Sequence, residues 1–563
     1  MLTRERALET LAREPFDIVV IGGGITGAGV ALDAASRGYS VALVEKADFA
    51  SGTSSRSSKL VHGGLRYLQN FDLGLVREAL LERQLMVRLA PHLVKPLKMV
   101  VPAFDGARPD RLVGIGLNMY DVMATARLRG RRARRAAARA QRGIEEEPES
   151  DWSPERHRVI SGEEVAELLP ALVPKNPTGG YLFYDCQTDD SRLVLTILAE
   201  AERFGAICAN RLEVLELAHE DGAAAGVKVL DRESGDAFVV RADTVINATG
   251  VWADRITPEE LHSEAEVPTI APSRGTHVIL ADADLPLRAA AIVPAGEGRS
   301  IFALPWLGCA LVGTTDNNYE GEIDHVQPSL EDIEYLLDAT NAFFGTELGP
   351  GDLHGAFAGV RPLISSGDTR KSVDISRKAE LYETSSGMIT ITGGKLTTWR
   401  RMAKATVDRV VEREGREAPC RTHEIPLGQQ VDPEGLPRVE GVPDESYLAL
   451  ARRYGHASER VLKTAAERGE LAQPIVPGFP DLLAEAVYAV RQEQARTVGD
   501  VLLRRTRLGL LAGRRVTAEP DGAPLRVARA IGTELGWDAA RVTAAVEDFR
   551  REAGFEGISG DVG

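Results

Sequence analysis

The chain has 563 residues, of which 44% are hydrophobic and 27% are charged, and its formal net charge at pH 7 is -16. Because a single hydrophobic core stops growing at about 250–300 residues, this length predicts two or three domains. The acidic balance argues against nucleic acid as the main partner, and the lack of any apolar run of about 18 residues argues against a membrane-spanning helix.

Residues 16–46 predict a strand, a tight turn, a helix and a second strand, which form a βαβ unit. In this turn Gly22 permits a tight bend, Gly24 lets the backbone approach a pyrophosphate, and Gly27 lets helix and strand pack closely. The helix N-terminus offers N–H groups to phosphates. Glu45 ends the second strand, where a carboxylate suits ribose hydroxyls and disfavours a 2′-phosphate. The unit predicts a dinucleotide cofactor without deciding between NAD and FAD.

Helical and strand-like segments alternate through the middle of the chain. Residues 70–91 predict an amphipathic helix closed by a proline, and residues 190–205 predict another helix. Strand-like runs follow up to Gly250 and again over 270–316, before a further helix at 329–344.

The last third changes character. Residues 387–412 repeat the pattern of strand, glycine turn and helix. A Pro/Gly-rich stretch at 421–446 predicts a linker, and mainly helical patterns follow from Tyr447 onward.

A Ser/Gly-rich loop followed by HGGLRYL, within residues 51–68, identifies the cofactor more closely. This segment resembles the FAD-dependent glycerol-3-phosphate dehydrogenases, and the resemblance covers most of the chain in matching order and spacing. Glycerol-3-phosphate oxidases share these motifs, and amine-oxidising flavoproteins are more distant relatives. The further matching motifs are YDCQTDDSRLVL (184–195), INATGVWAD (246–254), RGTHVIL (274–280), GTTDNNYEG (313–321), GVRPL (359–363), GGKLTTWRRMA (393–403) and RTVGDVLLRRTRLGL (496–510).

The resemblance implies an α/β flavoprotein fold. A doubly wound, Rossmann-like FAD-binding domain is expected to be interleaved with a mostly β substrate domain and followed by a C-terminal helical domain. The expected ranges are 1–80, 160–270 and 350–415 for the FAD-binding domain, 81–159 and 271–349 for the substrate domain, 421–446 for the linker, and 447–563 for the helical domain.

The resemblance also implies which residues contact FAD. The small residues ending at Gly250 let a turn approach the cofactor, and the glycine turn at Gly394 opens a helix whose N-terminus could stabilise the reduced ring. The expected FAD-binding residues are Gly22, Gly24, Gly27, Glu45, Ser57, Lys59, Leu60, Val214, Gly250, Gly394, Leu396 and Thr397.

A phosphate dianion needs cations, and three of them lie inside motifs of small or apolar residues. These are Arg66, Arg361 and Lys395. Each could instead pair with a structural carboxylate, but the resemblance favours a phosphate-binding cluster made of all three. Tyr67 either shapes the same pocket or packs as an ordinary aromatic residue. The aspartate of the GTTD motif, Asp316, is expected to be structural.

Oxidation of a secondary alcohol also needs a base for the hydroxyl proton. Histidine suits this role because its ordinary pKa lies near 6.5. Of ten histidines, His62 and His277 lie within the family motifs. One is expected to be the base and the other an orienting donor, and the sequence leaves open which is which.

The implied activity is oxidation of sn-glycerol 3-phosphate to dihydroxyacetone phosphate, with electrons passed from FAD to quinone. An oxidase that uses oxygen and releases hydrogen peroxide is the alternative enzyme, and a non-catalytic flavin-binding scaffold is the alternative of a different class. Glycerol 3-phosphate and an electron acceptor are the expected partners, a second copy of the chain is a further candidate, and no nucleic-acid partner is expected.

A block of eight arginines between Arg127 and Arg142 interrupts the acidic chain. It is either a solvated loop or a patch attracted to anionic lipid, at about 1 kcal/mol per charge near the surface, with an RNA-binding arm a distant third reading. The first fifteen residues lack the apolar core of a signal peptide, and four cysteines without CxxC spacing favour reduced thiols over a zinc site. A cytoplasmic protein without a metal is expected, with peripheral attachment to the inner face of the cell membrane as a candidate.

Overall fold

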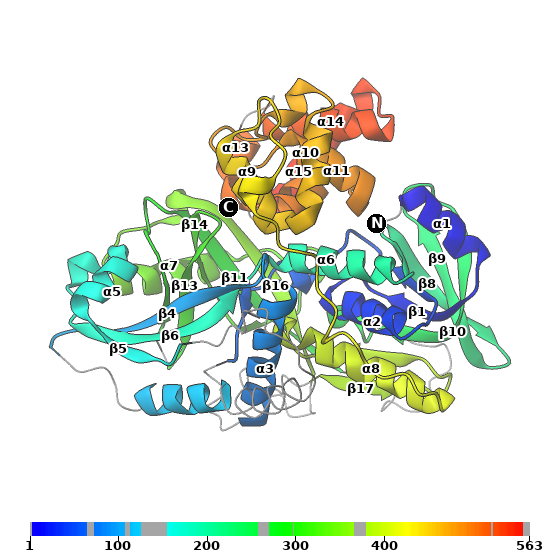
Figure 1. Cartoon of the computed structure of the whole chain (residues 1–563), viewed down its shortest axis with the longest axis horizontal. Coiled ribbons are helices and arrows are strands. Elements are labelled where there is room, and N and C mark those ends of the chain that lie inside the picture. The colour runs from blue at the N-terminus through cyan, green and yellow to red at the C-terminus, as the bar shows by residue number, and fades with distance from the viewer. Residues whose placement is uncertain are drawn as a thin grey trace, which may run out of the picture.

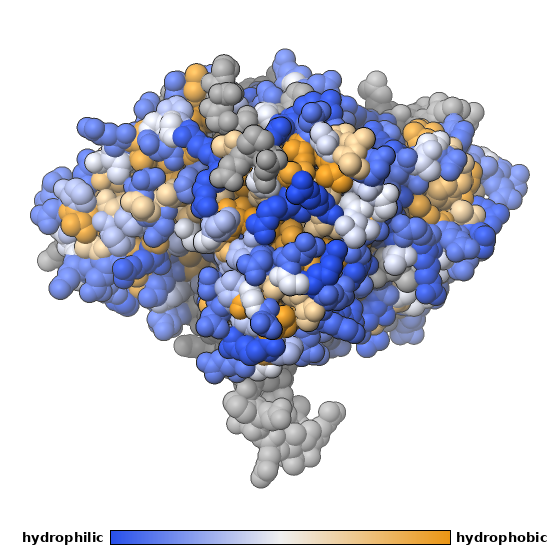
Figure 2. Space-filling model, turned by 90° about the horizontal axis from the view of Figure 1, so that it is seen from above, coloured by the Kyte–Doolittle hydropathy of each residue, from blue (hydrophilic) through white to orange (hydrophobic). Residues whose placement is uncertain are grey.

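The computed structural model shows two sheets side by side, with a helical domain lying over both (Figure 1). It describes residues 3–64, 73–106, 113–124, 155–256, 269–296, 298–364, 379–518 and 522–555. Seen from the side of the helical domain, the surface is mostly hydrophilic, with smaller hydrophobic areas between (Figure 2).

The first sheet has eight strands and carries the glycine turn. At its centre β1 (Phe16–Ile21) lies parallel to β2 (Val41–Val44) on one side and β10 (Ala237–Asn247) on the other. All the residues of β1 except Asp17 are buried, as expected for a parallel strand covered on both faces. The other strands are β7 (Ile207–Ala209), β8 (Leu212–Glu220), β9 (Ala223–Asp231), β17 (Glu380–Glu383) and β18 (Ile389–Thr392).

Three helices cover one face of this sheet. α2 (Ile25–Ser36) packs with α6 (Asp190–Arg203) and α8 (Trp399–Glu414) over the side chains of Ile18 and Val20. On the opposite face the alternate β1 side chains pack against α1 (Arg4–Arg13) and the antiparallel strands β8 and β9. The short turn between Ile21 and Ile25 places the N-terminus of α2 at the carboxyl end of β1, where parallel sheets of this kind bind ligands.

The second sheet has ten strands and is mostly antiparallel. Buried side chains of this sheet pack against α5 (Gly162–Leu168) and α7 (Leu330–Phe344). α7 begins as its sequence predicts, since Ser329 accepts a hydrogen bond from the amide of Asp332. The strands are β3 (Leu60–Val61), β4 (Lys95–Ala103), β5 (Arg158–Ser161), β6 (Gly179–Gln187), β11 (Ile270–Ala281), β12 (Ala290–Pro294), β13 (Ser300–Trp306), β14 (Cys309–Gly313), β15 (Asn317–Asn318) and β16 (Leu353–Ile364).

The helical domain follows the 415–443 connection and shares its core with strands of the second sheet. One segment of it, a π-helical turn at Asp500–Arg505, faces the first sheet. The helices are α9 (Asp444–Tyr454), α10 (Ser458–Ala465), α11 (Leu483–Glu493), α12 (Leu508–Leu511), α13 (Gly513–Ala518), α14 (Ala523–Leu535) and α15 (Ala539–Phe555).

The predicted α/β class with a C-terminal helical domain is confirmed. Each of the three ranges expected for the FAD-binding domain contains a strand that pairs within the second sheet instead, namely β3, β6 and β16. β3 pairs with β6 and β16 pairs with β11, and both partners are distant in sequence, so a local pattern does not reveal the pairing. The helix expected at 70–91 is α3 (Leu73–Leu89), and a further helix spans 113–124. Within the described ranges, no helix is both long and apolar enough to cross a membrane.

Candidate functional site

A cavity of about 1150 Å³ lies at the carboxyl end of β1 and is lined by residues of both sheets and of the helical domain. Fourteen of the predicted site residues line it. They are Gly22, Gly24, Glu45, Ser57, Leu60, His62, Val214, Gly250, His277, Arg361, Gly394, Lys395, Leu396 and Thr397. Gly27 and Lys59 do not line it, and Arg66, Tyr67 and the Arg127–Arg142 block lie outside the described residues.

The glycine turn at the start of α2 is formed by close backbone contacts. Gly22 has φ +109, and a Cβ there would lie 2.8 Å from the carbonyl oxygen of Ala248. A Cβ on Gly27 would lie 1.9 Å from the carbonyl oxygen of Gly22, so only glycine lets the helix approach the turn. Gly24 is the N-cap of α2, and Ser54 Oγ accepts a hydrogen bond from the amide of Ile25 at 2.9 Å. The turn therefore leaves an open cradle at a helix N-terminus, which suits a pyrophosphate.

The carboxylate of Glu45 is held against this turn by two backbone amides. Its two carboxylate oxygens accept from the amides of Gly23 at 2.7 Å and Ala47 at 2.8 Å. Burial raises its pKa, and the two amides act in the opposite direction. Each carboxylate oxygen can accept more than one hydrogen bond, so Glu45 can also accept from ribose hydroxyls.

Two further turns contribute small residues to the cavity. Gly250 has φ +63, and its carbonyl oxygen accepts a hydrogen bond from Thr392 Oγ1 at 3.0 Å. Gly394 has φ +71, and a Cβ there would lie 2.3 Å from the sulfur of Met402. A short 3₁₀ turn, Leu396–Thr398, then leads into α8, so the cavity meets the N-terminal side of a second helix.

Lys59, which is expected to bind the cofactor, does not line the cavity, and its side chain pairs with Asp190. Its ammonium is fully buried, 2.8 Å from one carboxylate oxygen of Asp190 and 3.0 Å from the other. Burial lowers its pKa to about 8, against the opposing effect of the Asp190 carboxylate. Lys59 therefore supports the loop from behind, while its neighbours Ser57 and Leu60 line the cavity.

His277 lies on β11 and is 2% exposed. Its ring stacks on Phe357 with the centroids 4.9 Å apart, and its Nε2 lies 2.9 Å from Ser58 Oγ. Among the described residues Nδ1 has no hydrogen-bond partner. Burial holds the pKa of His277 well below its usual value, and the positive charges of Lys59 and Arg361 act in the same direction. The imidazole is therefore neutral at pH 7.

His62 follows β3 and is fixed through its backbone. Its amide donates to Thr397 Oγ1 at 3.2 Å, and its ring meets the edge of Phe302 with the centroids 6.3 Å apart. The next amide, of Gly63, donates to the hydroxyl of Tyr120 at 2.9 Å. The structure thus brings both predicted histidines to one cavity.

Arg361 lies on β16, and its positive charge acts on His277. Its Nη1 is 2.9 Å from Oδ1 of Asp316, and its Nη2 is 3.5 Å from Thr314 Oγ1. Asp316, which the sequence predicts to be structural, also lines the cavity, so this ion pair adds it to the site. Its position in the GTTD motif, within a segment that resembles the family, was the available signal. Ser54 and Ser58 were also missed, although both lie in the Ser-rich loop.

The arrangement fits a flavin dinucleotide. A glycine cradle and a carboxylate lie toward one part of the cavity, and two histidines with a paired arginine line the same cavity. Within the described ranges there is no group of three or more His, Cys, Asp or Glu residues able to hold a metal ion.

Known proteins match this chain over nearly its full length. The model of the FAD dependent oxidoreductase family matches residues 17–409, and that of the C-terminal domain of alpha-glycerophosphate oxidase matches residues 389–542. The aerobic glycerol-3-phosphate dehydrogenase of Bacillus subtilis is 35% identical over 527 residues, which cover 90% of this chain and 89% of that protein. Glycerol-3-phosphate dehydrogenase 1 of Mycobacterium tuberculosis is 38% identical over 511 residues, or 88% of this chain and 92% of that one.

A solved structure agrees with these matches. The glycerol-3-phosphate dehydrogenase of Bacillus halodurans, complexed with FAD, superposes with a TM-score of 0.76 at 29% identity. The match covers 98% of this chain and 97% of that one, so it includes the helical domain as well as both sheets.

Proposed function

This chain belongs to the family of FAD-dependent glycerol-3-phosphate dehydrogenases, and from that premise we propose that it oxidises sn-glycerol 3-phosphate to dihydroxyacetone phosphate. The observation that carries the proposal is one cavity with a glycine cradle for a dinucleotide and, along its walls, Arg361, Lys395 and two histidines. The named relatives are dehydrogenases, which argues against a non-catalytic scaffold.

Substrate binding is assigned to Arg361 and Lys395. An arginine presents five N–H donors in a planar fork, so Arg361 can contact a phosphate while Asp316 holds the guanidinium in place. Lys395, which lines the same cavity, supplies a point charge. The same substrate role is proposed for Arg66 and Tyr67, on the resemblance alone.

Within this cavity we assign the base to His277 and the orienting role to His62. FAD, when bound, accepts the hydride that leaves C2 of the alcohol. Neutral His277 can take the hydroxyl proton, because burial keeps its imidazole uncharged. A phosphate bound at Arg361 would offset a positive charge that lowers the pKa of His277, so substrate itself would increase the proton affinity of the base.

The electron acceptor is proposed to be quinone, with oxygen as the alternative. The full-length relatives are named dehydrogenases, although the C-terminal family model carries the name of an oxidase. Anaerobic addition of glycerol 3-phosphate to the purified protein should bleach the flavin absorbance. Reoxidation by quinone much faster than by air would support the dehydrogenase, whereas rapid reoxidation by oxygen with stoichiometric hydrogen peroxide would establish the oxidase. No bleaching at all would refute the proposed substrate.

We propose that the protein contacts an anionic membrane through the helix at 113–124. Its outward face carries Ile115, Met119 and Val122, exposed by 58%, 37% and 63%, one to two turns apart. Figure 1 shows this helix, in light blue, on the side opposite the helical domain. The arginine-rich block that begins at Arg127 follows directly in the sequence, and basic residues beside an apolar face suit anionic headgroups.

Co-sedimentation with anionic and neutral vesicles over a salt series tests this contact. Replacing Ile115 and Val122 by serine, or Arg131, Arg132, Arg134 and Arg135 by serine, should abolish binding and leave flavin reduction intact. Val239→Ser, an exposed valine on β10, is the matched control. Equal binding to both vesicle types, or no binding at low salt, would contradict the proposal.

A further inference from the structure

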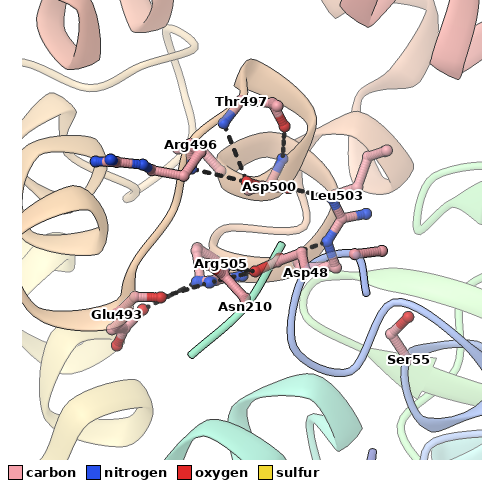
Figure 3. A network of polar contacts seen from close by, with 12 residues as sticks. Asp48, Ser55, Asn210, Glu493, Arg496, Thr497, Asp500, Leu503 and Arg505 are labelled. Atoms are coloured by element: carbon pink, nitrogen blue, oxygen red, sulfur yellow. Dashed lines mark hydrogen bonds and ion pairs between the residues drawn. The ribbon is translucent and has the colours of Figure 1, made fainter. Parts of the chain in front are cut away.

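One segment of the helical domain, residues 493–507, meets the loop at 46–59 that runs beneath the cofactor cavity (Figure 3). From residue 496 onward the segment belongs to the RTVGDVLLRRTRLGL motif, which supplies neither of the histidines and neither of the phosphate-binding cations proposed for this cavity. Its arginines Arg505 and Arg507 are 0% and 1% exposed. Arg505 pairs with Asp48, which follows β2, and Arg507 pairs with Asp189, which precedes α6.

The first contact fixes Asp48, three residues after Glu45. Arg505 binds both oxygens of the Asp48 carboxylate, with Nη1 2.5 Å from Oδ2 and Nη2 2.9 Å from Oδ1. Arg504 Nε adds a third bond at 2.7 Å, and Asn210 Nδ2 adds a fourth at 3.2 Å. Asp48 is fully buried and lines the cavity, so the helical domain defines where the chain runs after Glu45.

The second contact fixes the other end of the same loop. Arg507 pairs with Asp189 at 2.7 Å and with Asp190, and it donates to the carbonyl oxygen of Ser55 at 3.5 Å. The Asp190 carboxylate in turn accepts from the amide of Ser57 at 3.1 Å and from its hydroxyl at 2.7 Å. Both ends of the loop are therefore held by arginines of another domain.

Two serines of the same loop contact groups that line the cavity. Ser58, next to Ser57, places its hydroxyl 2.9 Å from Nε2 of His277. Ser54, on the same loop, accepts from the first amide of α2 at the glycine cradle. Movement of the loop would thus displace one partner of the histidine and one wall of the cofactor cradle together.

We propose that Arg505 and Arg507 are positioning residues, through which the helical domain sets both the retention of FAD and the placement of Ser58 against His277. The expected effect on the base His277 rests on the proposed function, whereas the expected effect on FAD retention does not. A guanidinium fork is needed here because each arginine binds two acceptor atoms at once, which a lysine ammonium cannot reproduce in the same geometry.

The test compares Arg507→Lys with Arg491→Lys. Arg491 is a matched control, because it also bridges two carboxylates, Glu467 at 2.9 Å and Glu534 at 2.7 Å, but within the helical domain. FAD affinity is measured by the fluorescence of cofactor released on dilution, alongside the absorbance spectrum of the bound flavin and thermal unfolding. Arg507→Lys is expected to weaken FAD binding about 10- to 100-fold and to shift the flavin spectrum, while Arg491→Lys retains both.

The reductive half-reaction, measured with excess FAD, provides the second readout. Arg507→Lys should lower the rate at saturating substrate and move its pH profile, since Ser58 no longer fixes His277, with KM changing little. Asp189→Asn removes one charge partner of Arg507 and should act in the same direction if Arg507→Lys fails to fold. If these variants keep the FAD affinity, flavin spectrum and pH profile of the wild type, the proposal is wrong. It is also wrong if Arg507→Lys and Arg491→Lys lose FAD to the same extent. A wild-type protein inert to glycerol 3-phosphate would refute the substrate but not the FAD measurements.

Discussion

Arg361 Nη1 lies 2.9 Å from Oδ1 of Asp316, and that carboxylate oxygen also accepts a hydrogen bond from Ser273 Oγ at 2.5 Å. An arginine held in this way presents its fork in a fixed direction, which reduces the entropy lost when a phosphate binds.

Asp316→Ala is therefore expected to raise KM for glycerol 3-phosphate about 5- to 20-fold, equivalent to about 1–2 kcal/mol, with a smaller change in kcat. Asp316→Asn keeps a hydrogen-bond acceptor beside Arg361 and should raise KM less. Steady-state kinetics of both variants check this, and an unchanged KM in Asp316→Ala would show that Arg361 needs no orienting partner.

Gly24→Val is expected to lower FAD occupancy at least tenfold without unfolding the protein. A Cβ at this position would lie 3.0 Å from Ser54 Oγ, and the branched side chain would extend into the cradle at the start of α2. Flavin absorbance per chain and circular dichroism measure the two effects separately. Gly469→Val, at a glycine with open space around it, is the control and should keep full occupancy.

His277→Gln is expected to slow flavin reduction by about 10²–10⁴-fold, with partial recovery at high pH, and His62→Gln to slow it less. Since the pKa of His277 lies well below 6.5, the base is already neutral above that pH. The acid limb of kcat/KM should therefore appear below pH 6.5. A larger loss in His62→Gln, or a limb near pH 7, would reassign the base to His62.

Stability should fall in acid because of His92, which is 3% exposed. Burial lowers its pKa from 6.5 to about 4, and the charges of Lys95, His456 and Arg192 act in the same direction. Between these two values the unfolded chain binds a proton that the folded chain does not, so the contribution is complete above pH 6.5 and is lost as pH falls toward 4. The loss should reach about 3 kcal/mol. Urea unfolding between pH 4 and 8 should show a shallower acid loss in His92→Phe than in the wild type; equal slopes would exclude His92 as the cause.

The parts of the site that depend on local chain geometry could be predicted from the sequence. The glycines at 22, 24 and 27 act within one turn and one helix, so their spacing between a predicted strand and a predicted helix indicates the cradle. The end of a helix at Leu89 is likewise predicted by the proline that follows it at position 91.

Features that depend on distant partners could not be predicted in this way. Membership of β16 in the second sheet depends on its pairing with β11, about eighty residues earlier. The motif around Lys59 predicts a cofactor contact, but the ammonium of Lys59 pairs with the Asp190 carboxylate and does not line the cavity. Asp316 reads as a turn residue until Arg361 is placed beside it.

The separation between Asp48 and Arg505 also bears on how the protein is made. They are 457 residues apart in the chain, so a nascent polypeptide that has completed both sheets still lacks the arginines that fix the loop at 46–59. Until the ribosome has delivered them, the cradle has its glycine turn but not its outer support. With the positioning role proposed for these arginines, chains cut short within this segment are expected to be poor flavin binders even with the whole βαβ unit intact.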